Sequence, residues 1–372
     1  MNIEGKYTTA KIYASTIDDG TIEQTKNICD HPIFADCKIR IMPDCHKGKG
    51  CTIGFTSEMP KGGEIIPNII GVDQSCGMYV VKLIDSDNLD EYEKLDKVIR
   101  KNIPTGTGAR KELSELIQEE LKEKICQISK DILKEESSEE DLLKIGTLGS
   151  GNHFISIEKG TTGTYLIIHS GSRNFGNKLA IHFQNLAIEK NCYGDNYLKQ
   201  LSYLTGKDAE NYLYCADVCR DYAHWSRKIM AEEILKNMNW QAEETFETLH
   251  NYIGKDNIIR KGAISAHKNE KVLIPLNMAD GSLICIGKGN KDWNDSAPHG
   301  AGRISTRTQA KANLSMDEYK SRMQGIFTTC ISTGTLDESP MAYKNADEII
   351  KSVEPTVEII DHIKPLYNFK AG

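Results

Sequence analysis

Five residues with metal-binding side chains lie in short segments that place glycine or another small residue beside an apolar run. They are Asp73 and Cys76 in "GVDQSCGM", His153 in "GSGNHFISIE", His169 in "YLIIHSGSR" and His250 in "TLHNYIG". Carboxylate, thiolate and imidazole groups together bind borderline divalent ions. This set supplies donors for two ions with one donor shared, and two ions about 3.5–4 Å apart are a common device in phosphoryl transfer.

Each of these residues taken alone has a simpler interpretation. Asp73 and Cys76 are typical of a capping aspartate beside a buried cysteine, and a single histidine is more often a core or surface residue. The metal hypothesis therefore depends on the whole set. A second cysteine pair, Cys215 and Cys219, is spaced by one helical turn, which favours packing inside a helix over metal binding.

The segment "MPDCHKGKG" groups Asp44, Cys45 and His46. These residues could supply further ligands or a general base. A structural role behind the site is equally consistent with the sequence.

In "SAPHGAGR", His299 is followed by Gly300, Ala301 and Gly302, which have almost no side chain. A histidine can attack phosphorus and form a phosphoramidate if its other nitrogen is held by a partner. The small residues would let a phosphate and ribose approach the backbone N–H groups, and Arg303 would offset the phosphate charge. An ordinary turn that contains a histidine is the alternative.

The net charge of −7 argues against a protein that coats nucleic acid by bulk electrostatics. A local basic groove remains compatible with that charge. Its candidate phosphate or RNA contacts are Arg173, Arg260, Lys261 and Arg303, with Arg307 nearby. Solvated surface charge is the alternative for each.

The composition, 39% hydrophobic and 27% charged over 372 residues, is that of a globular protein with a substantial core. We expect one large domain or two closely packed lobes. No apolar run has the roughly 18 residues of a membrane span, and the N-terminus lacks the apolar core of a secretion signal. Together with eleven scattered cysteines, this favours reduced thiols and a cytoplasmic location.

Hydrophobic periodicity predicts an α+β fold in which the candidate residues lie at strand ends and in glycine-rich turns. We expect short strands and turns over 1–110, an amphipathic helix over 111–135, an exposed acidic loop over 135–141 and a helical region over 208–249. Strands are predicted at "GKGCTIGFT", "GMYVVKLI", "HFISIE", "TYLIIH", "AISAH", "VLIPL" and "SLICIG", and the chain is expected to end in a helix and a tail.

These segments, in this order, resemble the RtcB-type RNA-splicing ligases, a family of 3′-phosphate/5′-hydroxyl RNA ligases. The matching stretches are "MPDCHKGKG", "GVDQSCGM", "GTLGSGNHF", "IHSGSR", "HNYIG", "IRKGAISA", "HGAGRISTR" and "SPMAYKNADEII", with a lysine near the C-terminus. The resemblance implies one α+β domain over 1–372, with mixed β-sheets flanked by helices around a central metal cleft.

The resemblance also implies residue roles. Asp73, Cys76, His153, His169 and His250 would bind two Mn²⁺ ions, with Cys76 shared, and His299 would be guanylylated by GTP. The implied guanylate pocket comprises Asn152, His153, Phe154, Ile155, Ser156, His250, Asn251, Pro275, Leu276, Asn277, Met278, Ser282, His299, Gly300, Ala301, Gly302, Tyr343 and Lys370.

The implied reaction joins an RNA 3′-phosphate or 2′,3′-cyclic phosphate end to a 5′-hydroxyl end, in tRNA splicing or RNA repair. A cyclic phosphate is first opened to a 3′-phosphate. His299 then takes GMP from GTP, GMP passes to the RNA 3′-phosphate, and the 5′-hydroxyl expels GMP. The resemblance further implies a monomer and an archease-like activator, and the lack of long apolar runs predicts no membrane partner.

The chain departs from the family pattern at the base pocket. Ser156 stands where the family usually has a glutamate that hydrogen-bonds the guanine edge, and Asn277 stands where serine is common. Glu158 lies two residues further on, hence on the same strand face, and is the candidate substitute. Three alternatives therefore stay open: use of another nucleotide, a metal-dependent RNA-end phosphoesterase, and a non-catalytic RNA-end binding protein.

Overall fold

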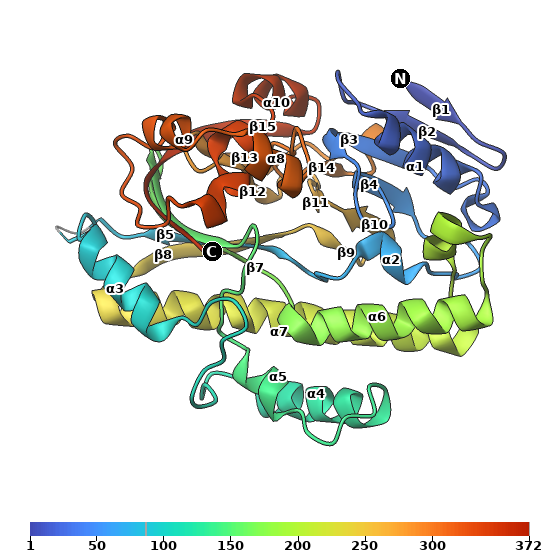
Figure 1. Ribbon diagram of the computed structural model, residues 1–372, viewed down its shortest axis with the longest axis horizontal. Helices are drawn as coiled ribbons and strands as arrows, with labels where there is room; N and C mark the ends of the chain where they lie inside the picture. The colour runs from blue at the N-terminus through green and yellow to red at the C-terminus, as the bar shows by residue number, and fades with distance from the viewer. Residues whose placement is uncertain (86–87, 372) are drawn as a thin grey trace.

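A computed structural model describes residues 1–85 and 88–371 of the chain, and in it two β-sheets lie over a layer of long helices (Figure 1). The first sheet has six strands in the order β1-β2-β3-β4-β10-β9, of which β2 and β3 are parallel. Its strands are β1 (Asn2–Glu4), β2 (Thr9–Ile12), β3 (Ile39–His46), β4 (Ile53–Glu58), β9 (Asn251–Ile253) and β10 (Ile258–Lys261).

The second sheet has seven antiparallel strands in the order β12-β13-β15-β6-β7-β5-β8. They are β5 (Gly77–Leu83), β6 (Phe154–Gly160), β7 (Gly163–Ser170), β8 (Ala242–Leu249), β12 (Lys271–Asn277), β13 (Gly281–Gly287) and β15 (Val357–Lys370). A two-stranded ribbon, β11 (Ala263–Ser265) with β14 (Ser296–Pro298), completes the β-structure of the described chain.

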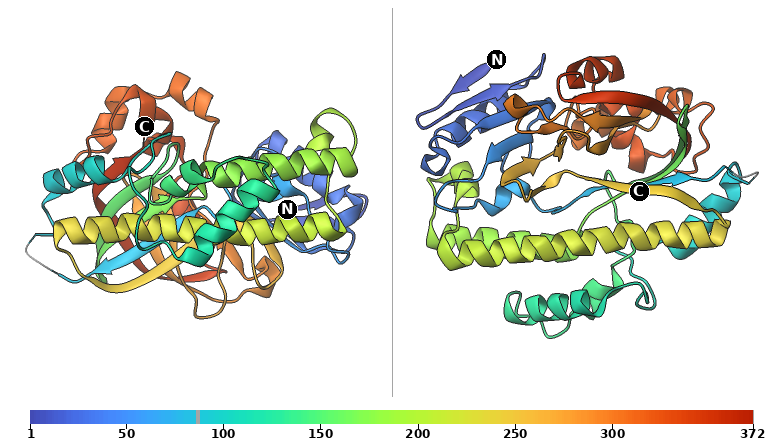
Figure 2. Two further views of the ribbon diagram at one scale, coloured as in Figure 1. Left: turned by 90° about the horizontal axis from the view of Figure 1, so that it is seen from below. Right: turned by 180° about the vertical axis from the view of Figure 1, so that it is seen from behind.

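Two long helices, α6 (Arg173–Lys190) and α7 (Gly206–Met238), run beneath the sheets, and α4 (Glu119–Asp131) and α5 (Glu139–Leu143) lie beyond them (Figures 1 and 2). The remaining α-helices are α1 (Asp19–Cys29), α2 (Pro67–Ile70), α3 (Tyr92–Asn102), α8 (Arg307–Asn313), α9 (Met316–Arg322) and α10 (Ala346–Val353). Short 3-10 turns are Pro32–Phe34, Asn196–Leu201, Lys291–Trp293, Thr333–Glu338 and Pro340–Ala342. The expected α+β class is confirmed.

Strand alternation explains why β5 can be buried on both faces. Tyr79 and Val81 pack in the cluster that contains Met230 and Ile234 of α7, so they face the helix layer. The intervening Met78 and Val80 belong to another cluster, with residues of β12, β13 and β15. Because successive side chains point to opposite faces of a strand, the central strands separate two apolar layers. The candidate metal ligands at the ends of these strands are therefore held by a well-packed sheet.

Several predicted elements have different bounds. The helix expected over 111–135 begins at Glu119, because residues 111–118 form turns and Leu113 and Leu116 project into solvent. The acidic segment 135–141 is not simply an exposed loop. Part of it forms α5, and Asp141 is buried with its Oδ2 2.5 Å from Lys178 Nζ.

The helix expected over 208–249 ends at Met238, where Asn239 adopts a left-handed conformation, and 242–249 form β8 instead. The prediction of a C-terminal tail is also wrong, since this segment forms β15, a 14-residue strand in the middle of the second sheet. Residues 1–110 contain α1, α2 and α3 in addition to the expected strands. Helices of the described residues are all too short or too polar to cross a membrane.

Candidate active site

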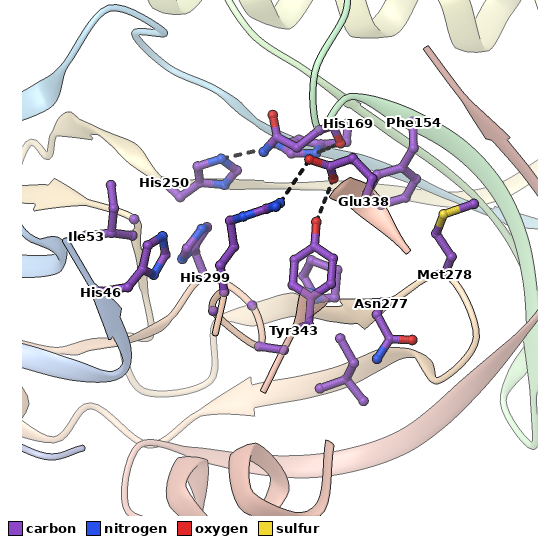
Figure 3. A pocket seen from close by; sticks show the side chains of 18 of the residues that line it. His46, Ile53, Phe154, His169, His250, Asn277, Met278, His299, Glu338 and Tyr343 are labelled. Carbon is purple, nitrogen blue, oxygen red and sulfur yellow. Dashed lines mark hydrogen bonds and ion pairs between the residues drawn. The ribbon is translucent and has the colours of Figure 1, made fainter. Parts of the chain in front are cut away.

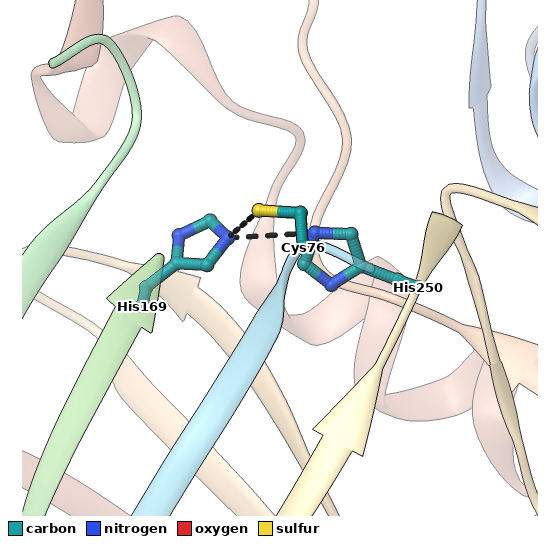
Figure 4. A group of neighbouring side chains, drawn as sticks. All are labelled: Cys76, His169 and His250. Atoms are coloured by element: carbon teal, nitrogen blue, oxygen red, sulfur yellow. Dashed lines mark hydrogen bonds between the residues drawn. The ribbon is translucent and has the colours of Figure 1, made fainter. Parts of the chain in front are cut away.

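Three of the predicted metal ligands meet at one end of three neighbouring strands. Cys76 precedes β5, His169 is the penultimate residue of β7, and His250 follows β8 (Figure 4). Because β5 pairs antiparallel with both β7 and β8, these three positions lie at the same end of the sheet. Cys76 Sγ lies 3.1 Å from His169 Nε2, which lies 3.4 Å from His250 Nε2.

Gly77 allows this close approach. A Cβ atom at Gly77 would lie 2.5 Å from the Thr248 carbonyl oxygen, so only glycine lets β5 pair so tightly with β8. The His250 N–H then donates to the Cys76 carbonyl at 2.9 Å. Backbone pairing therefore fixes the separation of these two ligands.

A second cluster shares Cys76 with the first. It consists of Asp73, Cys76 and His153, and in each cluster the ligand atoms lie within 4.8 Å of one another. His153 Nε2 lies 3.0 Å from Asp73 Oδ2 and 3.6 Å from Cys76 Sγ. The structure thus brings all five predicted ligands together, with the thiol between the two groups.

Backbone carbonyls orient two of the histidines. His153 Nδ1 lies 2.8 Å from the Leu148 carbonyl, and His169 Nδ1 lies 3.2 Å from that of Asn152. Each Nδ1–H donates outward, which directs Nε2 toward the cluster centre, as is usual for metal-binding histidines. Burial, followed by the nearby imidazoles, holds the pKa of His169 well below its ordinary value.

The charge balance of the clusters fits divalent cations. Burial, then the neighbouring His299, holds the pKa of His250 well below its ordinary value, so its imidazole is neutral and can donate a lone pair. Burial raises the pKa of Asp73, but its contact with His153 outweighs this and the pKa falls to about 2. Burial, followed by Asp73, raises the pKa of the Cys76 thiol, so binding a cation there would release a proton. Imidazoles, a carboxylate and an ionisable thiol suit borderline ions.

His299 lies beside the metal clusters, with its ring centroid 4.9 Å from that of His250. Its Nδ1 lies 2.6 Å from Asp44 Oδ2, and its backbone N–H donates to the same oxygen at 3.2 Å. Asp44 is fully buried at the end of β3. A proton shared with this carboxylate lies on Nδ1, which leaves the lone pair of Nε2 free to act as an acceptor, a ligand or a nucleophile.

Gly302 lets the His299 segment pack against β3. Its φ is +73°, and a Cβ there would lie 2.2 Å from the Asp44 carbonyl oxygen. The small residues after His299 therefore have a packing function as well as leaving open space. Of the neighbouring segment, His46 lines the same cavity, and burial lowers its pKa to about 4, whereas Cys45 packs in the core.

A cavity of about 640 Å³ extends from the clusters past His299 (Figure 3). Its lining includes most of the expected guanylate pocket: Asn152, Phe154, His250, Asn251, Pro275, Leu276, Asn277, Met278, Ser282, His299, Gly300, Ala301, Gly302, Tyr343 and Lys370. Ile155 is a correction, because strand alternation turns it to the opposite face of β6, where it packs in the core. His153 belongs to the second metal cluster.

The far end of the cavity contains polar groups with no partner among the described residues. Glu158 Oε2 and Asn368 Oδ1 are buried and unpaired, and both residues line the cavity together with Ser282, whose hydroxyl interacts with the Glu158 carboxyl. Ser156 lies behind them and donates to Glu158 Oε1 at 2.9 Å. Burial raises the pKa of Glu158 to about 7, against the opposing influence of the Ser282 and Ser156 hydroxyls.

A buried carboxylate, Glu338, lies near His169 and organises a cluster of polar side chains in the cavity wall (Figure 3). Its oxygens contact Lys370 Nζ at 3.0 Å, Tyr343 Oη at 2.6 Å and Arg303 Nη1 at 3.1 Å. Burial raises its pKa, but Lys370 and then Arg307 outweigh this and lower it to about 2. Sequence reasoning missed Glu338, which lies in a 3-10 turn without a distinctive motif.

The four predicted phosphate contacts have different positions. Arg303 lines the cavity, whereas Arg173 donates to the Gly106 carbonyl at 2.7 Å outside it. Arg260 is buried, with Nη2 2.6 Å from Asp256 Oδ2. Lys261 is buried too and donates to the Lys49 and Asn68 carbonyls. The expectation of RNA contact is therefore corrected for the two buried cations, whose donors have internal partners.

The two remaining cysteines that the sequence singles out lie away from this cavity. Cys215 and Cys219 are both buried in the core cluster that contains much of α7. The packing interpretation of this pair is confirmed.

Fold and site together define a class: an α+β protein whose metal-ligand clusters and partnered histidine open into one nucleotide-sized cavity. A family model described as tRNA-splicing ligase RtcB matches residues 24–371, so the chain belongs to the RtcB family. The chain is 29% identical to the RNA-splicing ligase RtcB of Escherichia coli K12, over 87% of each chain. It is 27% identical to the tRNA-splicing ligase RtcB of Nanoarchaeum equitans, over 94% of this chain and 91% of that protein.

Proposed function

We propose that this chain is an RNA ligase that joins 3′-phosphate or 2′,3′-cyclic phosphate ends to 5′-hydroxyl ends through a guanylylated His299. The observation that carries the proposal is the position of His299. Its Nδ1 is held by buried Asp44, and its ring lies beside metal ligand His250 in one cavity. Family membership supports RNA as the substrate.

In the first step, His299 Nε2 attacks the α-phosphorus of GTP. An N–P bond forms, the P–O bond to pyrophosphate breaks, and Asp44 stabilises the charge that develops on the imidazole. A 3′-phosphate oxygen of the RNA then attacks the same phosphorus and releases His299. Finally the 5′-hydroxyl attacks the RNA 3′-phosphorus and loses its proton, and GMP leaves. A cyclic end is opened by water beforehand.

Asp73, Cys76, His153, His169 and His250 would hold two Mn²⁺ ions, with Cys76 shared. Bound ions would neutralise phosphate charge as it moves between oxygens and nitrogen. Zinc or cobalt would suit the same donors, so the choice of manganese rests on the family resemblance.

The unpaired groups at the far end of the cavity support guanine as the base. Guanine presents two neighbouring N–H donors on its Watson–Crick edge, whereas adenine has an acceptor at the corresponding ring nitrogen. Glu158 Oε2 and Asn368 Oδ1 are buried acceptors without partners. Glu158 therefore takes the place of the family's usual glutamate at position 156, with Ser156 as its hydrogen-bond donor.

Three further features belong to the proposal: a cytoplasmic location, a monomeric state and an archease-like activator. The eleven cysteines are free in the structure, which is consistent with action in the reducing cytoplasm. A monomeric state and an archease-like activator rest on the family resemblance alone, and size measurement by light scattering tests the first of them.

The deciding experiment mixes purified protein with a 3′-phosphate RNA and a labelled 5′-hydroxyl RNA, while metal ion and nucleotide are varied. We expect a joined product with Mn²⁺ and GTP, little product with ATP, and none with Asp73→Ala. RNAs with 3′-hydroxyl and 5′-phosphate ends are the control and should stay unjoined. Loss of the 3′-phosphate without joining would instead identify a phosphoesterase, and binding without any chemistry would identify an RNA-end binding protein.

A further inference from the structure

Arg227 is a fully buried arginine in the middle of α7, in the helix layer beneath the metal clusters. A buried guanidinium must find hydrogen-bond acceptors to offset the loss of water. Those acceptors identify what the arginine holds in place.

Two of the acceptors belong to segments that contain metal ligands. Arg227 Nη1 donates to the Ser75 carbonyl at 3.0 Å and to the Ser170 carbonyl at 2.7 Å. Ser75 directly precedes Cys76, and Ser170 directly follows His169. One nitrogen thus joins the backbone beside two ligands that come from different strands.

The third acceptor extends the contact to the strand before His250. Arg227 Nε donates to Glu247 Oε1 at 3.1 Å, and Glu247 belongs to β8, three residues before His250. The other carboxylate oxygen, Oε2, lies 2.8 Å from His224 Nδ1. A single side chain therefore contacts the segments of all three ligands in the cluster of Cys76, His169 and His250.

The segment before Cys76 needs such support. Ser75 has φ +54°, a left-handed conformation that is uncommon for residues other than glycine and costs about 1–3 kcal/mol when the surroundings do not enforce it. The Ser75 N–H donates to the Asn251 carbonyl at 2.8 Å, and its carbonyl accepts from Arg227. The planar fork of arginine can meet acceptors in several directions at once, which a lysine ammonium on a flexible stem cannot reproduce.

We propose that Arg227 is a positioning residue that holds Cys76, His169 and His250 at metal-binding separation, with Glu247 fixing the guanidinium. The inference rests on the metal site of the proposed function. It assigns Arg227 no contact with RNA or nucleotide. Its effect is on how tightly and in what geometry the cluster binds a cation.

The test is titration of the metal-free, full-length protein with Co²⁺, which suits these donors and gives visible d–d and thiolate-to-cobalt absorption bands. The variants are Arg227→Lys and Arg227→Met. Arg260→Lys is the matched control, because Arg260 is equally buried and ion-paired but donates its hydrogen bonds to Asp256 and residues 294–296 instead of to the ligand segments, although its guanidinium lies over the Tyr252 ring. Circular dichroism and thermal melts identify which variants are folded.

We expect both Arg227 variants to bind Co²⁺ about 10–100-fold more weakly, as is typical when an outer partner of metal ligands is removed. Their thiolate band should weaken or shift, while Arg260→Lys keeps the wild-type spectrum. Glu247→Gln, which keeps the shape of the side chain, should give a smaller loss of Co²⁺ affinity. If the Arg227 variants do not fold, this variant tests the positioning role in their place.

Wild-type affinity and spectrum in folded Arg227 variants, or in Glu247→Gln when those variants are unfolded, would overturn the positioning role. Equal weakening by Arg260→Lys would also overturn it, since the effect would then be general destabilisation. If the wild-type protein shows no thiolate band, the proposed metal site itself fails. The two failures are therefore distinguishable.

Discussion

Replacing Glu158 with glutamine should stabilise the nucleotide-free protein in a pH-dependent manner. Glutamine keeps the shape of the side chain but cannot ionise. Burial raises the pKa of Glu158 from 4.5 to about 7, so the folded protein disfavours the charged carboxylate that the unfolded chain adopts readily. At about 1.4 kcal/mol per pH unit, this costs the wild type about 3 kcal/mol once the pH exceeds 7.

The sign follows from proton binding. Between pH 4.5 and 7 the folded protein holds a proton on Glu158 that the unfolded chain has lost, so wild-type stability falls as pH rises through this window. Glu158→Gln lacks this dependence. We take the difference in free energy of unfolding between variant and wild type near pH 4 as the reference. Relative to it, the variant should be about 3 kcal/mol more stable than the wild type at pH 8 and less than about 1 kcal/mol more stable at pH 5.

The assay is urea unfolding of both proteins in EDTA at several pH values from 5 to 8, followed by tryptophan fluorescence. The wild-type-minus-variant difference cancels the titration of all shared groups. Glu338→Gln is a control of opposite kind, because the pKa of Glu338 is lowered to about 2. Its charge stabilises the fold throughout this range, and this stabilisation is lost only as the pH falls from about 4.5 to about 2. That variant should be less stable by a nearly constant amount from pH 5 to 8.

A stability difference between wild type and Glu158→Gln that does not change with pH would refute the reasoning. It would mean that Glu158 ionises in the folded protein near its ordinary pKa. The burial that we assign to the far end of the cavity would then be wrong. The proposal that the unpaired Glu158 carboxyl binds a nucleotide base would lose its support.

Three further predictions concern the nucleophile, its packing and the metal clusters. Asp44→Asn should slow nucleotide transfer to His299 by roughly 10²–10⁴-fold, because the wrong tautomer is favoured; single-turnover labelling measures this, and a near-wild-type rate would contradict it. Gly302→Ala should lower the free energy of unfolding by at least about 1–3 kcal/mol, because its Cβ would meet the Asp44 carbonyl at positive φ; an unchanged urea midpoint would contradict it. Mn²⁺ at 100 times its Kd should stabilise the wild type by about 2.7 kcal/mol and His169→Ala much less in thermal melts; equal stabilisation would contradict the assigned cluster.

The metal ligands could be predicted from sequence because their chemistry is local. Asp73, Cys76, His153 and His169 each adjoin a strand whose apolar run is evident, so their place at strand ends followed from periodicity. Their convergence could not follow from it. It depends on the pairing of β5 with β7 and β8, which is a tertiary property.

The misassigned segments show how tertiary pairing overrides local preference. "AEETFETL" contains glutamates typical of a helix, yet it forms β8 because it pairs with β5 along its whole length. The prediction therefore placed His250 at the end of a helix, when it follows a strand. The same effect hid β15, and with it Asn368, whose amide faces the cavity only because this terminal strand enters the sheet beside β6.

The measurement that tests the account most directly is covalent labelling of the protein by GTP. The protein is incubated with [α-³²P]GTP and Mn²⁺, denatured, and examined for radioactivity that remains on the chain. We predict labelling of the wild type that is acid-labile, as expected of a phosphoramidate, and none of His299→Ala. Equal labelling of the two proteins, or label from [γ-³²P]GTP, would contradict the assignment of His299 as the guanylylated nucleophile.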